Sequence, residues 1–329
     1  MKANVLHQFG GPEVLIWEEI PTPVPQAGEV LLRIEAAGVN LGDATTRRGV
    51  GMPLTLPAVL GHEAAGIIEA VGDGVQHLST GQRVVAASYV AGRSGAYASH
   101  TSVPAAAVYP LPSGVSFDAA NALATAGVTA LGLYGLVDVA GRTAVVHAAA
   151  GGVGNILVQL LAAAGATVIA TVGDPAKGAS LAGLGAAHVL STRDDWVAGV
   201  RELTGGRGPE LIYDSIGGEV AEQSLDLLAL EGTLIVYGAS SGSAAALDAG
   251  RMLSMVMKSQ GLRGYSLMPA LSTPQGSERI GTMLADLFAR VENGSLTPLI
   301  GQRFPLSQAA QAHLLIESRQ SVGKIILVP

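Results

Sequence analysis

The chain has 329 residues, enough for two domains, and its net charge of −7 excludes the concentrated positive charge that a nucleic-acid surface requires. It contains no cysteine, which excludes disulfides, thiolate nucleophiles and cysteine-based zinc sites. No segment reaches the roughly 18 uninterrupted apolar residues of a membrane span, and the first residues lack the apolar core of a signal peptide. We therefore expect an acidic cytoplasmic protein with neither a nucleic-acid nor a membrane partner.

Residues 1–118 are rich in glycine and proline and contain alternating apolar segments, which predicts a β-rich first domain. From Phe117 onward, helical patterns alternate with short β-branched runs, which predicts a parallel, doubly wound sheet. A helix at 277–293 and the tail 302–329 then look like a return to the first domain. Helices are further expected at 118–125, 129–136, 155–164, 176–184, 194–203 and 220–228, and strands at 143–147, 167–172, 188–190, 210–213, 233–236 and 261–265.

The stretch 143–174 reads as strand, glycine-rich turn, helix and second strand. Measured against the dinucleotide fingerprint G-x-G-x-x-G, it has Ala149 first, Gly151 third and Gly154 sixth, so only the first position departs. Gly151 would let the main chain approach a pyrophosphate, and Gly154 would let the helix pack closely on the strand. Small residues before a helix also serve packing alone, but the order of the four elements favours nucleotide binding.

Motifs spread along the chain resemble those of the medium-chain dehydrogenase/reductase superfamily, and within it the zinc-free quinone oxidoreductase branch that includes ζ-crystallin. They are residues 38–43 (GVNLGD), 61–66 (GHEAAG), 71–72 with 81–84, 149–154, 213–218, 237–238 and 323–327. The resemblance covers essentially the whole chain. It implies an α/β protein with a GroES-like β-barrel catalytic domain (1–120 and 266–329), an inserted Rossmann domain (121–265) and an active-site cleft at their junction.

Zinc-dependent relatives place a cysteine, a histidine and a second cysteine where this chain has Asn40, His62 and Thr125. One imidazole cannot form a three-ligand catalytic site, although Asp43 and Glu63 could supply oxygens. We therefore expect no metal, and His62 is expected to be a hydrogen-bonded residue of the cleft.

The cofactor that the resemblance implies is NADPH. At the end of the second Rossmann strand, where an acidic residue would bind the ribose of NAD, this chain has Gly173, and Lys177 matches the lysine that contacts the 2′-phosphate in the family. Asp174 could instead read the ribose, or it could cap the helix that follows. The expected cofactor contacts are Asn40, Thr129, Ala150, Gly151, Gly152, Val153, Gly154, Gly173, Lys177, Thr192, Arg193, Tyr237, Ser240 and Lys324. For Thr129, Tyr237 and Lys324 the alternatives are a helix-start hydroxyl, a strand-end aromatic and a solvated side chain.

The family's chemistry is hydride transfer to a quinone or an α,β-unsaturated carbonyl compound, and this needs no metal. The cleft candidates are Asn40, Asp43, Thr45, His62 and Glu63, none of which is identified as the proton donor. Thr45 stands where enoyl-thioester reductases carry a tyrosine, so an enoyl thioester is the second choice of substrate. The substrate pocket is expected from 48–52, Tyr89 and 237–250, and Arg47 is either an anion contact or a solvated or salt-bridged residue.

A protein of another class is also compatible with these residues, namely an NADPH-binding protein with a structural role or vestigial activity. The resemblance further implies a homodimer in which the strand at 261–265 pairs across a two-fold axis.

Overall fold

The computed structural model describes residues 1–271, 273 and 275–329. The chain divides into two compact units, one comprising Met1–Val128 with Ala270–Pro329 and the other comprising Thr129–Pro269. The second unit begins later than the predicted residue 121. The reason is that helix α2 (Phe117–Ala122) and the π-helix after it (Leu123–Gly127) pack on elements of the first unit.

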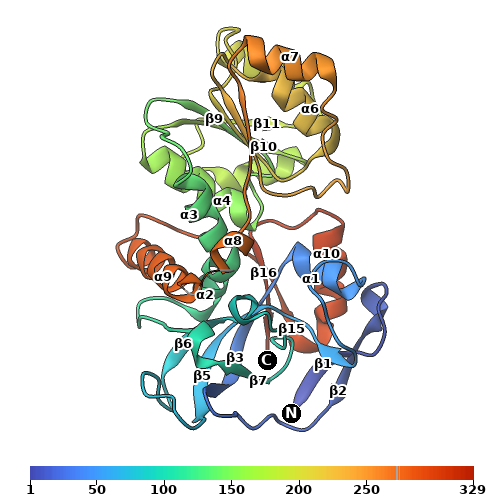
Figure 1. Cartoon of the computed structure of the whole chain (residues 1–329), viewed down its shortest axis with the longest axis vertical. Helices are drawn as coiled ribbons and strands as arrows, with labels where there is room; N and C mark the ends of the chain where they lie inside the picture. The colour runs from blue at the N-terminus through green and yellow to red at the C-terminus, as the bar shows by residue number, and fades with distance from the viewer. Residues whose placement is uncertain (272, 274) are drawn as a thin grey trace. The chain divides into compact units, whose positions relative to one another are not determined.

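The first unit is built around β3 (Glu29–Val39), an almost fully buried strand of 11 residues. It pairs with β5 (Glu63–Val71), β7 (His100–Pro104) and β16 (Lys324–Val328), all antiparallel. Strands from the two ends of the colour scale, blue and red, therefore share one sheet (Figure 1), and the predicted return of the chain to its first domain is confirmed.

Among the described residues, this sheet has the order β15-β16-β3-β5-β6-β8, and a smaller sheet has the order β2-β1-β4. Apolar side chains from both chain ends share one core, among them Ile34, Tyr97, Ile325 and Leu327. The other elements are β1 (Lys2–Leu6), β2 (Leu15–Glu19), α1 (Leu41–Arg47), β4 (Ala58–Val59), β6 (Arg83–Ala87), β8 (Val108–Pro110), α9 (Gly276–Glu292), β15 (Ile300–Pro305) and α10 (Ala309–Glu317), with 3-10 helices at Pro12–Val14, Ser88–Ala91, Ala105–Ala107 and Leu306–Gln308.

The second unit is the predicted doubly wound domain. Its described strands form a parallel sheet in the order β11-β10-β9-β12-β13-β14. The chain first adds strands on one side of β9 (Thr143–Val146) and then, from β12 on, on its other side, so the strand order reverses at β9. Ligands of such sheets bind at the carboxyl ends of the strands on either side of this reversal. The remaining elements are α3 (Val128–Tyr134), α4 (Gly152–Ala163), β10 (Thr167–Val172), β11 (His188–Ser191), α5 (Trp196–Leu203), β12 (Leu211–Asp214), α6 (Gly218–Leu227), β13 (Thr233–Val236), α7 (Ala249–Met257), β14 (Gly261–Gly264) and α8 (Met268–Leu271).

Two elements differ in type from the prediction. The helix expected at 176–184 is a short 3-10 helix, Pro175–Leu181, in which only Leu181 is buried, so it has no apolar stripe to hold an α-helix against the sheet. The expected helices 118–125 and 129–136 are joined by the π-helix. This segment is buried almost all round, and its residues therefore carry no helical periodicity to read.

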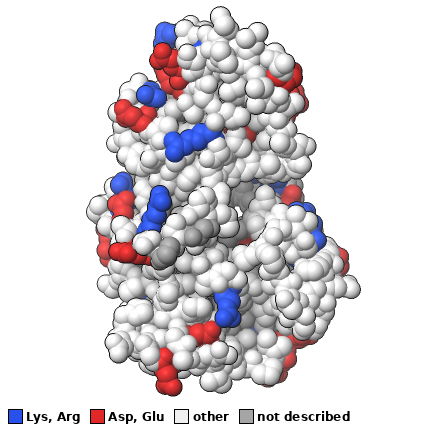
Figure 2. Space-filling model, in the orientation of Figure 1, with Lys and Arg blue, Asp and Glu red and all other residues white. Residues whose placement is uncertain are grey.

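The surface and the helices agree with the charge and hydropathy of the sequence. On the face shown in Figure 2, basic and acidic side chains are interspersed among uncharged ones. Within the described residues, no helix combines the length and apolar character needed to cross a bilayer.

Candidate functional site

Four of the five predicted cleft residues gather in the first unit, at the ends of β3 and β5 and the start of α1. Asn40 precedes α1, and its backbone N–H donates to Asp43 Oδ2 at 2.7 Å. This closes the first turn of the helix and turns the Asp43 carboxylate back toward β5, where Glu63 begins the strand and His62 immediately precedes it. The local hydrogen bonding of the Asn-x-x-Asp segment thus builds the cluster.

Asp43 is fully buried and forms an ion pair with Nδ1 of His62. The Tyr97 hydroxyl also faces the Asp43 carboxylate. Burial alone would raise the pKa of Asp43, but the charge and hydrogen bond of His62 lower it below its ordinary value. Burial likewise disfavours the charged form of His62, yet Asp43 and Glu63 raise the His62 pKa above its ordinary value.

Glu63, Asn40 and Lys324 form a second polar group. Lys324 Nζ pairs with Glu63 Oε1 and donates to Asn40 Oδ1, while Asn40 Nδ2 donates to Glu63 Oε1 at 2.9 Å. Lys324 is 3% exposed, so the solvated alternative for this residue is wrong. A Cβ atom at Gly38 would lie 2.7 Å from Lys324 Cε and closer still to the Glu63 carboxylate, so glycine at this position leaves room for the pair.

Three atoms of the cluster are buried without a hydrogen-bond partner among the described residues, namely Asp43 Oδ1, His62 Nε2 and Glu63 Oε2. Of these, Asp43 Oδ1 faces His62 Nδ1 in the ion pair. The buried hydroxyl of Thr125, in the π-helix, also has no hydrogen-bond partner among the described residues. Buried polar atoms are nearly always satisfied, and π-helical turns are frequent at functional sites. We interpret the other three atoms as groups that a bound molecule or water would satisfy.

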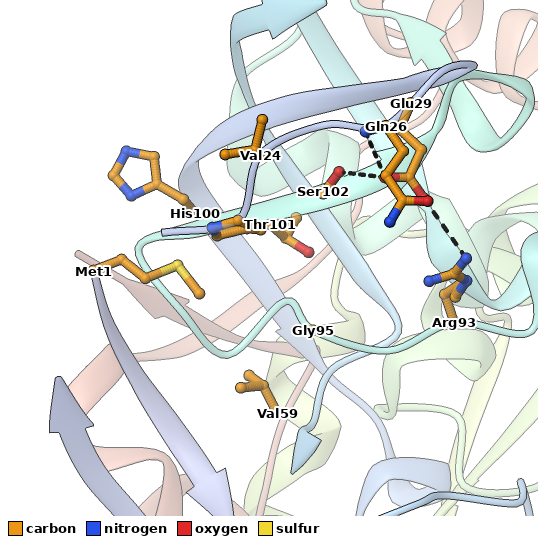
Figure 3. Close-up of a pocket in the computed structure, with 11 residues that line it drawn as sticks. Met1, Val24, Gln26, Glu29, Val59, Arg93, Gly95, His100, Thr101 and Ser102 are labelled. Atoms are coloured by element: carbon orange, nitrogen blue, oxygen red, sulfur yellow. Dashed lines mark hydrogen bonds and ion pairs between the residues drawn. The ribbon is translucent and has the colours of Figure 1, made fainter. Parts of the chain in front are cut away.

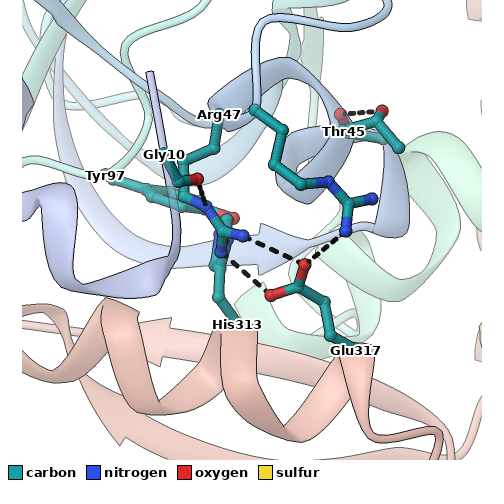
Figure 4. A network of polar contacts seen from close by, with 8 residues as sticks. Gly10, Thr45, Arg47, Tyr97, His313 and Glu317 are labelled. Carbon is teal, nitrogen blue, oxygen red and sulfur yellow. Dashed lines mark hydrogen bonds and ion pairs between the residues drawn. The ribbon is translucent and has the colours of Figure 1, made fainter. Parts of the chain in front are cut away.

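Thr45 and Arg47 are engaged within the protein. Thr45 Oγ1 donates to the carbonyl of Gly42 at 2.8 Å, inside its own helix. Arg47 is 1% exposed and binds Glu317 through two hydrogen bonds of 3.0 Å, as Figure 4 shows. The salt-bridged alternative for Arg47 is therefore confirmed, although the residue is not solvated.

The glycine-rich turn of the second unit has the predicted form of strand, turn, helix and second strand. After β9, Ala148 takes a positive φ of 50°, and Gly151 N–H donates back to its carbonyl at 2.9 Å. Gly151 then caps α4, so Gly152, Val153 and Gly154 form its first turn, where backbone N–H groups have no carbonyl four residues before them. Such a turn binds anions.

The two fingerprint glycines have different surroundings. A Cβ at Gly154 would lie 2.7 Å from Ala149 Cα and 2.9 Å from its carbonyl carbon, whereas a Cβ at Gly151 would meet only the Ala148 carbonyl oxygen, at 3.2 Å. Packing therefore requires glycine at 154. Gly151 and the buried Ala150 complete the small-residue cradle.

The residues predicted near the ribose lie together at the ends of β10 and β11. Gly173 is exposed, and a Cβ there would have nothing within 4 Å, so the protein itself does not require a glycine. Asp174 accepts from Ala176 N–H at 3.0 Å, which confirms it as the cap of the following turn, and it pairs with Arg193 at 3.4 Å. Thr192 N–H donates to Val172 O beside this pair.

The charges of Asp174 and Arg193 both shift the pKa of Lys177. Partial burial lowers its pKa, the Asp174 carboxylate raises it, and the Arg193 guanidinium lowers it further. Two cations thus lie close to one carboxylate beside a position without a side chain.

The other predicted contacts of the second unit follow its strands. Tyr237 and Ser240 come after β13, and their N–H groups donate to Asp214 O and Ser215 O, each at 2.9 Å. Burial raises the pKa of Tyr237 to about 12, so its phenol is neutral at pH 7. Thr129 is half-buried in α3.

A separate pocket of the first unit, with a volume of about 310 Å³, contains none of these residues (Figure 3). Glu29 lies at its wall, accepts from Ser102 at 2.8 Å and pairs with Arg93 at 3.6 Å. Because its charged groups neutralise each other, we assign it no role in the site.

Three buried or half-buried residues around the site are not predictable from the local sequence, namely Tyr97, His313 and Glu317. Their partners lie far away in the chain; Arg47 and His313, for example, are separated by 266 positions. One local signal exists: the helix period places polar His313 on the buried face that it shares with Ala309 and Ala312.

Two family models match this chain, one described as "Alcohol dehydrogenase GroES-like domain" over residues 26–113 and one as "Zinc-binding dehydrogenase" over residues 152–280. A 2-haloacrylate reductase from a Burkholderia species is 35% identical, covering 99% of this chain and 98% of the relative. Quinone oxidoreductase 1 of Escherichia coli K12 is also 35% identical, covering 98% of each chain.

Solved structures of related proteins also match the whole chain. The chain matches E. coli quinone oxidoreductase complexed with NADPH at a TM-score of 0.90 and 34% identity, and a mycobacterial protein complexed with NADPH at 0.89 and 37%. Both matches cover 100% of each chain.

Because one family model is described as zinc-binding, the donors at the corresponding positions must be tested for zinc. Asn40 is bound to Glu63 and Lys324, and the ammonium group of Lys324 would repel a metal cation there. In the part of the chain that the structure describes, no three His, Asp or Glu side chains are grouped so that they could share a metal ion. The residues do not fit a catalytic zinc.

Proposed function

This chain belongs to the medium-chain dehydrogenase/reductase superfamily, in its quinone oxidoreductase branch, and from this membership we propose that it is an NADPH-dependent, metal-free reductase of quinones or α,β-unsaturated carbonyl compounds. The observation that carries the cofactor assignment is the ribose end of the nucleotide site. There Gly173 leaves space, and Lys177 and Arg193 supply positive charge for a 2′-phosphate.

When bound, NADPH supplies a hydride from the nicotinamide ring. The first turn of α4, at Gly152 and Val153, would hold the pyrophosphate through backbone N–H groups. We keep Asn40, Thr129, Tyr237, Ser240 and Lys324 as the proposed neighbours of the nicotinamide.

The cluster around Asp43 and His62 is the proposed place of the substrate oxygen. Addition of a hydride to an enone or a quinone leaves negative charge on this oxygen, and donors arranged around it lower the barrier. His62 is the buried donor of the cluster whose outer nitrogen lacks a partner among the described residues, and it therefore suits this role. Asp43 and Glu63 act through His62 and Lys324 rather than on the substrate.

The alternative substrate is an enoyl thioester, and the properties of the Thr45 hydroxyl make this alternative less favourable. This hydroxyl already donates to Gly42 O and is a far weaker acid than the tyrosine that thioester reductases carry at this position. The alternative from another class is an NADPH-binding protein without turnover.

A single assay separates these functions. Protein treated with chelator is mixed with NADPH and, in turn, a naphthoquinone, a simple enone, a 2-haloacrylate and a crotonyl thioester, and NADPH consumption is followed. Turnover of the first three that is unaffected by added zinc is the expected result. Tight NADPH binding with no turnover of any acceptor would identify a binding protein, and preference for the thioester would identify the alternative enzyme.

We further propose that the protein is a homodimer through β14 and α7. β14 pairs only with β13 among the described strands, and Leu262 on it is exposed. None of the residues of α7 is buried, and four of its large apolar side chains are exposed: Met252, Leu253, Val256 and Met257. An open strand edge beside an apolar helix face would be covered by a second copy.

Because the enzyme would draw on cellular NADPH, we place it in the cytoplasm.

A further inference from the structure

A series of polar side chains runs from the half-buried Glu317 to the buried Asp43, as Figure 4 shows for most of its members. Arg47 Nη1 contacts His313 Nδ1 at 3.0 Å, and His313 Nε2 contacts the Tyr97 hydroxyl at 3.1 Å. The Tyr97 hydroxyl in turn faces the Asp43 carboxylate. Arg47, Tyr97 and His313 are at most 1% exposed.

Arg47 decides the direction of every hydrogen bond in this series. A guanidinium group can only donate, so Nδ1 of His313 must accept. Burial lowers the pKa of His313 to about 4, so at pH 7 the ring is neutral and its single proton lies on Nε2. That N–H donates to the Tyr97 oxygen, and the Tyr97 O–H is therefore left to donate to Asp43.

The same chemistry excludes a proton wire. A relay must release a proton at one end and take one up at the other, but an arginine in a protein does not lose its proton. The series therefore fixes the direction of its hydrogen bonds and does not transfer protons.

Three groups face the Asp43 carboxylate: the Asn40 backbone N–H donates to Oδ2, His62 Nδ1 forms an ion pair with Oδ1, and the Tyr97 hydroxyl lies beside the carboxylate. These groups together favour the ionised form of Asp43, and the ion pair requires the proton on Nδ1 of His62. The other groups that face His62 are Glu63 and the Lys324 ammonium that neutralises it. Nε2 of His62 is then the ring atom left over, buried and without a partner in the described chain.

We propose that Arg47, His313 and Tyr97 are positioning residues that act through Asp43 to hold His62 with Nε2 as the atom that donates to the substrate oxygen. The inference rests on the proposed function. In the step concerned, hydride addition to the substrate carbon oxidises NADPH to NADP⁺ and leaves an oxyanion. The oxyanion takes the Nε2 proton of the charged His62, and the neutral ring regains a proton from solvent.

The first test needs neither a variant nor activity. Long-range ¹⁵N–¹H spectra of the unmodified protein labelled at its seven histidines report which nitrogen of each ring carries the proton. We expect His313 to be neutral at pH 7 with the proton on Nε2, and His62 to retain the proton on Nδ1 when its ring loses charge at high pH. Assignment follows from the spectra of His62→Gln and His313→Gln. A proton on Nδ1 of His313, or a neutral His62 protonated on Nε2, would overturn the proposal, whether or not the protein reduces any acceptor.

The second test removes one hydroxyl. Tyr97→Phe keeps the ring and deletes the donor to Asp43, so the carboxylate loses part of its stabilisation and its support for charged His62 weakens. We expect the NMR titration of His62 and the alkaline limb of kcat/KM to move together to lower pH by about half to one unit, with NADPH affinity unchanged.

Tyr109→Phe is the matched control. It deletes a half-buried tyrosine hydroxyl of the same unit, one that contacts Ser277 instead. A purely packing role for Tyr97 predicts that both variants behave alike, and an unmoved His62 titration in Tyr97→Phe would overturn the proposal.

Discussion

Substitution of Gly154 by alanine tests whether the turn before α4 is a close-packed nucleotide cradle. The new Cβ would lie 2.7 Å and 2.9 Å from Cα and C of Ala149, and nearer still to the carbonyl oxygen of Ala148. These are backbone atoms, so relief requires the helix to move away from the turn by several tenths of an ångström. Overpacking of this kind costs about 1–3 kcal/mol.

Both stability and binding are expected to fall in this variant. The cost corresponds to a loss of Tm of about 2–4 °C per kcal/mol for a unit of this size. Because the N–H groups of the first turn are displaced together, we expect the Kd for NADPH, measured by calorimetry, to rise at least about tenfold, which equals a loss of roughly 1.4 kcal/mol.

Two neighbouring glycines serve as controls. Gly173→Ala adds its Cβ in open space and should leave the Tm unchanged, because nothing lies within 4 Å. Gly151→Ala meets one carbonyl oxygen at 3.2 Å, so it should reduce NADPH affinity with little loss of stability. If Gly154→Ala kept both the Tm and the Kd of the unmodified protein, the proposed packing of the turn would be refuted.

Three further predictions concern charge, acid and assembly. Lys177→Ala should abolish most of the preference for NADPH over NADH in calorimetric titrations; equal affinities before and after the change would mean that Asp174 or another group reads the ribose. Acid should destabilise the fold, because burial lowers the pKa of His147 to about 3 and of His313 to about 4, while unfolded imidazoles titrate near 6.5. The unfolded state therefore gains protons first as the pH falls, and each histidine costs about 2 kcal/mol at pH 5 relative to pH 7.5; a constant urea midpoint over that range would contradict this. Leu262→Arg should convert the dimer to a monomer in light scattering, and a monomeric unmodified protein would disprove the proposed interface.

The Rossmann unit was predictable because its signals are local. The stretch 143–174 contains strand, turn, helix and second strand in sequence, and each is stabilised by neighbours on the same short piece of chain. The confirmed cap at Asp174 is equally local, since its partner Ala176 lies two residues away. By contrast, α7 was not predicted, because none of its residues is buried and it therefore presents no buried apolar face to the rest of the described chain.

The candidate site was predictable only in part. Asn40, Asp43, His62 and Glu63 belong to two short motifs, so their assembly follows once β3 and β5 are known to pair. The position of Lys324 followed from the resemblance alone. The sequence on either side of Tyr97 does not predict its contact with Asp43, because that contact depends on how segments far apart in the chain pack. The cofactor contacts themselves stay predictions.

The pairing of β16 with β3 has a consequence for the synthesis of this protein. Ile325 pairs with Val39, so the first unit cannot complete its sheet until the whole intervening unit has left the ribosome. At about 5–20 residues per second, the early strands wait on the order of tens of seconds with one edge of β3 open. During that interval the unpaired strand edge can pair with strands of other unfolded chains. We therefore expect ribosome-associated chaperones to bind nascent chains of this protein before β16 has been synthesised.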